Sequence, residues 1–439
     1  MNSKKIYELF IKEKDTHICI DSRSPNIKNS IFFGIKGERF NGTSFAKMAI
    51  DNGAKIAIVD TSNKLDHSVI VVPNPLKILQ EIAQIHRSTF NIPVIAITGS
   101  NGKTTTKNIL TQILSGLFKT SSTKGNFNNH IGVPLTILSL KKHHEIVIVE
   151  MGANHVGEIK YLCKIAQPTH GMITNIGSAH IEGFGSLKNI TNAKNELFDF
   201  LKINNGTIIY NSKDQTLIDL IKNYKKTIPY KAPNFINEHK EIKDNTDFNY
   251  SCKPFIVINP MNPTSKITTQ IIGKYNINNI IAAMKIAEVM KVPFDVIRNQ
   301  LQSIKLKNNR SELIKTKRNH ILLDAYNANP TSMAKAIKDF LEIKDFLNYK
   351  TPLLILGDML ELGVDALYYH QKIVKLIEKN NIKNCILIGE IFCQTKCNYI
   401  KIYNTNNISK VMSLKNIGQK SILIKGSRKL KLETMVPFL

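Results

Sequence analysis

Long apolar runs are missing from this sequence. None of its 439 residues belongs to an apolar stretch approaching the ~20 residues that cross a bilayer. The opening segment, Met1–Glu8, lacks the apolar core of a secretory signal. Six scattered cysteines do not make a disulfide framework, and the C-x3-C pair of Cys393 and Cys397 lacks the second pair of ligands that a zinc site needs. We therefore expect a cytosolic, soluble protein without a zinc site at that pair.

Acidic residues are also few: 34 Asp and Glu stand against 60 Lys and Arg, which gives a formal net charge of +26. Such a balance often indicates nucleic-acid binding. Here lysine is spread along the whole chain together with abundant isoleucine and asparagine, and no basic motif is interleaved with aromatic residues. We interpret the charge as compositional drift and expect no nucleic-acid partner. A basic surface also suits a polyanionic substrate.

The chain is longer than one hydrophobic core usually supports, and β-branched strands alternate with helical segments along it. We predict an α/β fold of three domains. A central domain, residues 86–308, holds a P-loop-type, mostly parallel sheet with helices. It is flanked by a small α/β N-terminal domain, residues 1–85, and a Rossmann-like C-terminal domain, residues 309–439. Residues 230–270 are polar, and we expect an irregular or antiparallel elaboration there.

A glycine-rich turn follows the predicted strand at residues 92–98. The turn reads Gly99-Ser-Asn-Gly-Lys-Thr104, and apolar residues at helical spacing follow it. Strand, glycine-rich turn and helix form the context in which such a turn cradles phosphate. Gly99 and Gly102 let the backbone approach the anion, Lys103 can reach the β- and γ-phosphates, and the Thr104 hydroxyl can bind Mg²⁺. We predict a nucleotide phosphate site, although the glycines are closer together than in the standard Walker pattern.

Polar residues stand at the ends of the next predicted strands. Glu150, Asn175 and His180 are placed there, and ligands of parallel sheets bind beyond the carboxyl ends of the strands. A carboxylate such as Glu150 can bind Mg²⁺ directly. The polar segment at residues 125–134 could fold over the nucleotide. Lys194 lies in a predicted helix, where the sequence pattern alone indicates a solvated surface lysine.

Four segments in series resemble the Mur ligases, the ATP-dependent amide-forming enzymes of peptidoglycan precursor synthesis. They are Thr98–Lys107, Gly125-Asn-Phe-Asn-Asn-His-Ile-Gly-Val-Pro-Leu135, Glu150-Met-Gly-Ala-Asn154 and Asn175-Ile-Gly-Ser-Ala-His180. Within that family, three later segments look like the branch that adds D-alanyl-D-alanine. These are Asp324-Ala-Tyr-Asn-Ala-Asn-Pro330, Leu356-Gly-Asp-Met-Leu-Glu-Leu-Gly363 and Ile424-Lys-Gly-Ser-Arg428. The resemblance covers essentially the whole chain. It implies that a monomer uses ATP and Mg²⁺, at two metal sites, to join UDP-N-acetylmuramoyl-tripeptide to D-alanyl-D-alanine through an acyl phosphate.

The resemblance also implies a role for individual residues. The catalytic residues would be Lys103, His180, Lys194 and Arg310. Those that bind ATP would be Gly99, Ser100, Asn101, Gly102, Lys103, Thr104, Thr105, Asn276, Asn279, Arg310 and Asp324. The metal ligands would be Thr104, Glu150, His180 and Lys194, with Lys194 carbamylated. Residues near the dipeptide would be Asn327, Asn329 and Asp358, and those near the uridine nucleotide Asp21, Ser22, Arg23, Lys36 and Arg39.

Two departures from the family pattern concern fine contacts. Ala325 replaces a usual serine, and the segment Lys307-Asn-Asn-Arg310 is less glycine-rich than usual. Among alternatives, the diaminopimelate- or lysine-adding ligase is disfavoured because an Asp-Asn-Pro-Arg motif is absent. The muramate-alanine ligase is disfavoured because no dinucleotide-type loop opens the chain. Folylpolyglutamate synthase shares the ATP loop but not the two later motifs that begin at Asp324 and Leu356. A basic nucleic-acid-binding NTPase would leave the last 130 or so residues unexplained.

Overall fold

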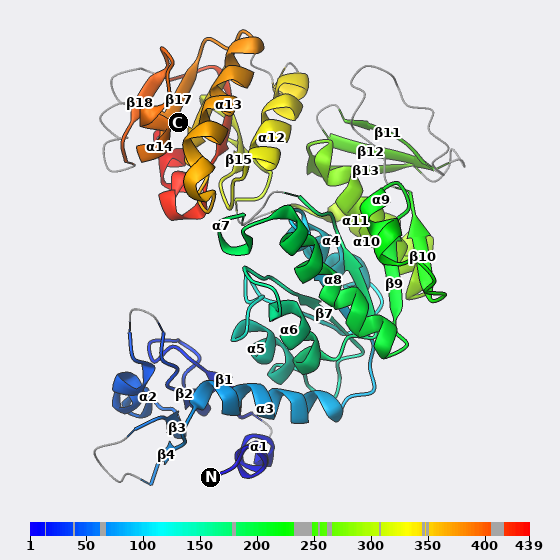
Figure 1. Ribbon diagram of the computed structural model, residues 1–439, viewed down its shortest axis with the longest axis vertical. Helices are drawn as coiled ribbons and strands as arrows, with labels where there is room; N and C mark the ends of the chain where they lie inside the picture. Colours follow the sequence, from blue (N-terminus) through cyan, green and yellow to red (C-terminus); the bar gives the residue numbers. More distant parts are fainter. Residues whose placement is uncertain are drawn as a thin grey trace.

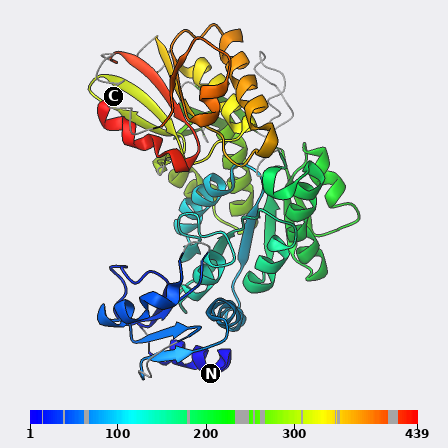
Figure 2. The same ribbon diagram turned by 60° about the vertical axis from the view of Figure 1, so that its left-hand side comes forward.

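The computed structural model describes most of the chain. The described residues are 1–13, 15–37, 40–61, 67–177, 181–231, 248–252, 255–260, 266–306, 309–344, 347, 351–404 and 417–439. Three sheet-centred units follow one another along the longest axis of the molecule, with the two chain ends in the outer units (Figure 1, Figure 2). The predicted α/β class is confirmed. Within the described residues, no helix combines the length and the apolar character that crossing a bilayer requires.

The first unit is a four-stranded parallel sheet. Its strands, in spatial order, are β1 (His17–Cys19), β2 (Ser30–Phe33), β3 (Ile56–Val59) and β4 (Val69–Val71). Its helices are α1 (Ser3–Lys12), η1 (Gly42–Phe45) and α2 (Ala46–Asp51). Every residue of β2 is buried, as expected for an inner strand of a parallel sheet that is covered on both faces.

Helix α3 (Pro75–Ser88) leads from the first unit to the second. The Asn74 side chain accepts a hydrogen bond from the N–H of Lys77, and Pro75 occupies the first turn, two features that are typical of a helix start. The helix packs against α1 on one side and against α5 and α6 on the other. Helix α3 continues without a break past residue 85, the predicted end of the first domain. The predicted domain limits at residues 85 and 308 stay predictions.

The central unit is a six-stranded parallel sheet in the order β10-β9-β8-β5-β7-β6. Its strands are β5 (Val94–Thr98), β6 (Thr120–Ser122), β7 (Ile146–Glu150), β8 (His170–Ile173), β9 (Thr207–Asn211) and β10 (Thr227–Tyr230). Its helices are α4 (Lys103–Ser115), α5 (Gly132–Leu138), α6 (Glu158–Ala166), α7 (Ile181–Phe184), α8 (Leu187–Ile203), α9 (Gln215–Leu220), α10 (Tyr275–Val289) and α11 (Phe294–Ser303). Strands β6 and β10 were not predicted from the sequence.

Alternate residues of the central strands face two separate cores. In β5, Val94 and Ala96 pack with residues of α3, α5, α6 and α8, whereas Ile95 and Ile97 pack with residues of α4, α10 and α11. Both sets are fully buried because successive side chains of a strand point to opposite faces. The carboxyl ends of β5, β7 and β8 therefore lie at one edge of a rigid, doubly covered sheet.

A small antiparallel sheet fills the predicted elaboration. It consists of β11 (Phe248–Cys252), β12 (Phe255–Pro260) and β13 (Ile267–Ile272). The expected antiparallel character is confirmed for the described part of residues 230–270.

The third unit is a mixed six-stranded sheet in the order β14-β15-β19-β16-β17-β18. Its strands are β14 (Glu312–Lys315), β15 (Asn319–Asp324), β16 (Pro352–Gly357), β17 (Cys385–Ile388), β18 (Ile400–Ile402) and β19 (Lys420–Lys425), and only β14 pairs antiparallel. Its helices are α12 (Pro330–Ile343), η4 (Gly363–Asp365), α13 (Ala366–Lys379), α14 (Glu390–Gln394), η6 (Arg428–Leu430) and η7 (Leu432–Phe438). Strands β14 and β18 were not predicted from the sequence. Ala325 is fully buried in an apolar cluster of this unit, where a serine hydroxyl would need a hydrogen-bond partner.

Candidate active site

A polar cleft of about 1050 Å³ lies where the central and third units meet. It brings together most of the predicted nucleotide residues from both units. The predicted residues that line it are Ser100, Asn101, Gly102, Lys103, Thr104, Thr105, Glu150, Asn276, Asn279, Arg310, Asp324, Asn327 and Asn329. Residues from the turn before α4 and from α4, β7, α10 and β15 therefore share one cavity although the sequence separates them widely.

The turn between β5 and α4 requires glycine at two positions. Gly99 has φ +139° and Gly102 has φ +83°, values that L side chains rarely adopt. A Cβ atom would lie 2.1 Å from Thr174 Oγ1 at Gly99 and 2.4 Å from Asn279 Oδ1 at Gly102. Gly102 also occupies the N-cap position of α4, so free N–H groups of the first helical turn face the cleft. This is the geometry of an anion site.

Lys103 folds back over this turn. Its Nζ donates to the carbonyl oxygens of Gly99 (2.6 Å) and Ser100 (3.2 Å). Burial lowers the pKa of Lys103, and Glu150 opposes that shift. A phosphate in the turn would offer the ammonium group a stronger, charged acceptor than two carbonyls.

Glu150 is a buried carboxylate with unused capacity. It is 1 % exposed, and its Oε1 accepts hydrogen bonds from Thr104 Oγ1 and Asn128 Nδ2, both at 2.8 Å. Oε2 makes no hydrogen bond to any described residue, and Lys107 Nζ lies 3.9 Å away. A carboxylate and a hydroxyl beside a phosphate site are the oxygen ligands that Mg²⁺ takes when it binds together with phosphates. The described residues contain no group of three acidic, His or Cys side chains that could hold a metal alone.

Lys107 and Asn128 both lie beside Glu150, and neither was predicted as a site residue. Lys107 is 3 % exposed, and its Nζ donates to the carbonyl oxygens of Thr123 (2.7 Å) and Gly125 (3.4 Å). It thereby holds the start of the polar segment that carries Asn128. The only sequence signal for Lys107 was its spacing of four from Lys103, which places both on one face of α4.

Lys194 corrects the interpretation drawn from the sequence pattern alone. It is 2 % exposed inside α8 rather than solvated, and its Nζ lies 5.1 Å from the centre of the Phe184 ring. Burial lowers the pKa of Lys194 to about 7, with Lys103 adding to the shift and Glu158 and Glu196 opposing it. Lys194 is not among the residues that line the cleft.

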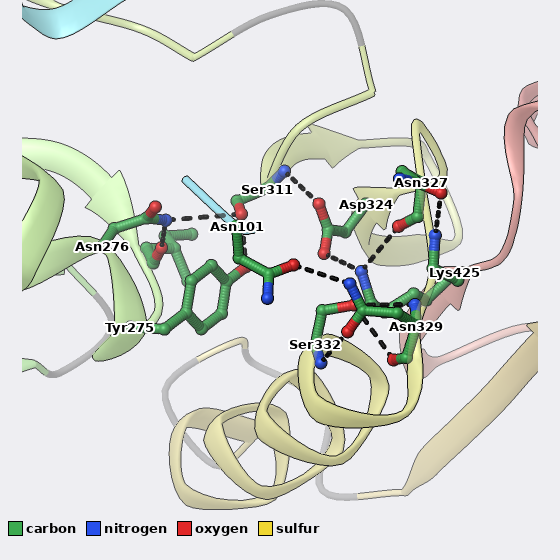
Figure 3. A network of polar contacts seen from close by, with 11 residues as sticks. Asn101, Tyr275, Asn276, Ser311, Asp324, Asn327, Asn329, Ser332 and Lys425 are labelled. Carbon is green, nitrogen blue, oxygen red and sulfur yellow. Dashed lines mark hydrogen bonds and ion pairs between the residues drawn. The ribbon is translucent and has the colours of Figure 1, made fainter. Parts of the chain in front are cut away.

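The third unit contributes a connected polar network (Figure 3). Asp324 accepts hydrogen bonds from the N–H of Ser311 (3.2 Å) and from Lys425 Nζ (2.6 Å). Lys425 also donates to the carbonyl oxygen of Asn327 (3.2 Å). Asn329 caps α12 and donates across the cleft to Asn101 Oδ1 of the phosphate turn (2.7 Å). Lys425 and Ser311 were not predicted as site residues, although Lys425 lies in the family segment Ile424–Arg428.

Arg310 stacks on an aromatic ring in the same region. Its guanidinium carbon lies 3.6 Å from the centre of the Tyr326 ring, and that of Arg428 lies 4.9 Å from the same ring. The ring therefore holds two cations beside the cleft.

The two predicted adenine-side asparagines brace the phosphate turn. Asn276 Nδ2 donates to the carbonyl oxygen of Ile272 (2.8 Å), and Asn279 Nδ2 donates to Asn276 Oδ1 (3.0 Å). Thr106 Oγ1 of α4 donates to Asn279 Oδ1 (3.2 Å). Although both residues line the cleft, most of their hydrogen-bonding capacity is used within the protein.

The structure does not bring every predicted residue to the cleft. Asp358 is 3 % exposed within the third unit and accepts hydrogen bonds from the N–H groups of Ile391 (3.0 Å) and Phe392 (2.9 Å) at the start of α14. The Asp358 carboxylate therefore caps α14 and faces His370 rather than the cleft.

Those predicted uridine residues that the structure describes lie in the first unit, away from the cleft. Asp21 pairs with Arg23 (3.1 Å), Ser22 is buried, and Lys36 is exposed. Arg39, Lys307 and His180 lie outside the described residues.

Comparison with known proteins gives consistent matches over the whole chain. Residues 97–287 match the Mur ligase middle domain, and residues 309–423 match the Mur ligase, glutamate ligase domain. The UDP-N-acetylmuramoyl-tripeptide–D-alanyl-D-alanine ligase of Buchnera aphidicola subsp. Baizongia pistaciae is 36% identical over 95% of this chain and 91% of that protein. The corresponding Bacillus subtilis ligase is 32% identical over 93% of this chain and 90% of its own length.

Solved structures show the same similarity. MurF from Acinetobacter baumannii superposes with a TM-score of 0.81 at 28% identity and covers 96% of this chain and 92% of that one. The MurF ligase from Thermotoga maritima in complex with ADP has a TM-score of 0.80 at 24% identity, with 97% of both chains covered.

Proposed function

The chain belongs to the Mur ligase family, and on that premise we propose that it is an ATP-dependent ligase which adds D-alanyl-D-alanine to UDP-N-acetylmuramoyl-tripeptide in peptidoglycan precursor synthesis. One observation of the molecule carries the proposal. The phosphate turn of the central unit and the polar network of the third unit line a single cleft. A site divided in this way suits a ligase that must activate a carboxylate and then deliver an amine to it.

The reaction requires acyl activation. The terminal carboxylate of the tripeptide attacks the γ-phosphorus of ATP, so a C–O–P linkage forms and ADP leaves. The amine of D-alanyl-D-alanine then attacks the acyl carbon, and the tetrahedral intermediate expels inorganic phosphate. Lys103 and Arg310 offset the charge that builds up during phosphoryl transfer. The meeting of two units around the cleft helps to exclude water from the hydrolysable acyl phosphate.

Glu150 and Thr104 would hold Mg²⁺ beside the phosphates. A bound Mg²⁺ would supply positive charge that neutralises the phosphate oxygens. Oε2 of Glu150 supports this role because it accepts no hydrogen bond from any described residue and its ion pair with Lys107 Nζ is long, at 3.9 Å. A buried carboxylate oxygen in that position is better satisfied when a cation binds close to it. Binding of Mg²⁺ would replace the hydrogen bond from Thr104 Oγ1 to Glu150 Oε1.

We also propose that Lys194 is carbamylated and that it helps to hold a second metal together with Glu150 and His180. Carbamylation forms an N–C bond between the neutral amine and CO₂ and releases one proton. The deep burial of Lys194 favours the neutral amine, since desolvation penalises the ammonium form. The product carries a negative charge, which a metal ion would stabilise.

The remaining assignments follow from the same proposal. The first unit, with Asp21, Ser22, Arg23, Lys36 and Arg39, would bind the UDP portion of the substrate. The third unit would bind the dipeptide near Asn327 and Asn329. Because both nucleotide substrates belong to the cytoplasm, we place the enzyme there, and we expect it to act as a monomer.

Phosphate release tests the proposal directly. The purified protein is mixed with ATP, Mg²⁺, UDP-N-acetylmuramoyl-tripeptide and D-alanyl-D-alanine, and each component is omitted in turn. We expect release to require all four and to fail when L-lysine, diaminopimelate or L-glutamate replaces the dipeptide. Release that does not depend on the dipeptide, or that nucleic acid stimulates instead, would overturn the assignment.

A further inference from the structure

Helix α10 receives its N-terminal cap from another unit of the protein. Lys274, at the N-cap position, provides no side-chain capping bond to the described part of this helix. The cap comes instead from α12 of the third unit, where an Asp339 carboxylate oxygen accepts a hydrogen bond from the N–H of Tyr275 (3.1 Å). One turn further along α12, Glu342 forms an ion pair with Lys274. A carboxylate at a helix N-terminus satisfies a free N–H group and complements the helix dipole.

The start of α10 also contacts Ser311, in the segment that connects the central unit to the third unit. The Tyr275 hydroxyl and the Ser311 hydroxyl form a hydrogen bond, and the N–H of Ser311 donates to Asp324 in the cleft (Figure 3). Burial raises the pKa of Asp339 to about 6, Glu342 adds to that rise, and the N–H of Tyr275 and the charge of Lys274 oppose it. The capping carboxylate is partly buried.

Helix α12 touches the central unit at a second point. At its N-terminus, Asn329 donates to Asn101 of the phosphate turn. Ten residues separate Asn329 from Asp339, which corresponds to about 15 Å along a helix. The Asn101 contact joins two neutral amides at the place where phosphate is expected, whereas the other contact uses one partly buried carboxylate and one ion pair. Nucleotide binding would therefore disturb the Asn101 end first and leave the Asp339 end in place.

The geometry points to Asp339 as a positioning residue for the ATP site, which acts through α10 and forms the pivot between the central and third units. The first turn of α10 carries Asn276, which holds Asn279. Asn279 in turn bonds to Thr106, and its side chain packs directly against Gly102 of the phosphate turn. Loss of the cap would loosen this turn and with it the support behind the phosphates. Only the predicted change in KM rests on the proposed function, since the cap itself is a property of the fold.

Amide hydrogen exchange and steady-state kinetics of the full-length Asp339→Ala variant test the inference. We expect exchange in the peptide covering residues 273–279 to become faster by about 5- to 30-fold, the effect of losing a capping contact of 1–2 kcal/mol. The KM for ATP should rise by a similar factor, whereas the KM for UDP-N-acetylmuramoyl-tripeptide should stay within about twofold, because the first unit lies at the other end of the molecule. Asp339→Asn keeps an acceptor oxygen and should restore part of both effects.

Two further variants make the outcome decisive. Glu342→Gln removes the ion pair with Lys274 but keeps Asp339, and it should show a smaller change of the same kind. Asp295→Asn is the matched control, because Asp295 is an exposed first-turn acid of α11 that pairs with Arg298 inside its own helix. Unchanged exchange in Asp339→Ala would overturn the inference, as would faster exchange throughout residues 309–344 or an equal rise in both KM values. If the wild-type protein shows no ligase activity, the proposed function fails, while the exchange measurement still decides whether Asp339 caps α10.

Discussion

Lys425 should be essential to the stability of the third unit and to the position of Asp324. The Lys425 side chain is 3 % exposed and the Asp324 side chain 16 %, and their charged atoms are 2.6 Å apart. Lys425→Met keeps most of the apolar stem but leaves a mostly buried carboxylate without its counter-charge. Removing one partner of a buried ion pair costs about 3–5 kcal/mol. We expect about 3 kcal/mol here, at the lower end, because Asp324 retains some contact with water and the N–H bond from Ser311.

The magnitude can be measured with a double-mutant cycle. Lys425→Met, Asp324→Asn and the double variant are unfolded by urea, and the transition of the third unit is followed separately because a three-unit chain need not unfold in one step. The double variant should cost at least about 1 kcal/mol less than the sum of the single variants, since it leaves no unpaired charge. A cycle that is additive within about 0.5 kcal/mol would refute the argument. Lys425→Met should also raise the KM for ATP, as Asp324 would no longer be held toward the cleft.

Three further predictions concern other parts of the molecule. Gly102→Ala combines an unfavourable φ with a steric clash, so nucleotide binding should weaken at least about tenfold, whereas Gly185→Ala, which has φ +72° and open space, should bind nucleotide normally in the same titration. His86 donates through Nε2 to a carbonyl and accepts at Nδ1 from the Tyr7 hydroxyl (3.0 Å), and burial lowers the pKa of His86. The contribution of that bond to stability is therefore complete above pH 6.5 and is lost as the pH falls further. The free energy of unfolding should differ by about 1 kcal/mol between wild type and Tyr7→Phe, and this difference should shrink on acidification. A difference that thermal unfolding shows to be independent of pH would contradict this. Lys194→Ala should lower phosphate release by about 10- to 100-fold, the usual effect of disturbing a metal site, and bicarbonate or a short carboxylic acid should restore part of it; undiminished activity would exclude the proposed role.

Much of the fold was accessible from the sequence because its signals are local. The buried strand, the glycines and the lysine of the phosphate turn are consecutive, and their geometry depends on neighbours within a few residues. The same holds for the start of α3, where Asn74 is the N-cap and Pro75 lies in the first turn. Strands of three or four residues, such as β6, β14 and β18, were missed because so short a segment carries little periodicity.

The sites that depend on partners far along the chain could not be predicted in this way. The bond between Asn101 and Asn329 joins residues 228 positions apart, and that between Asp324 and Lys425 joins residues 101 positions apart. Asp358 illustrates the converse, since a carboxylate in a motif associated with the substrate is used here to cap α14.

The phosphate turn and the family motifs are thus properties of the sequence, since residue type and spacing alone decide which backbone shapes and which anion contacts they permit. The depth at which Lys194 is buried, the neighbours of Glu150 and the capping of α10 by Asp339 are properties of the assembled units. Burial and charge pairing depend on distances through space, and chain folding brings those groups together without leaving a mark in the local sequence.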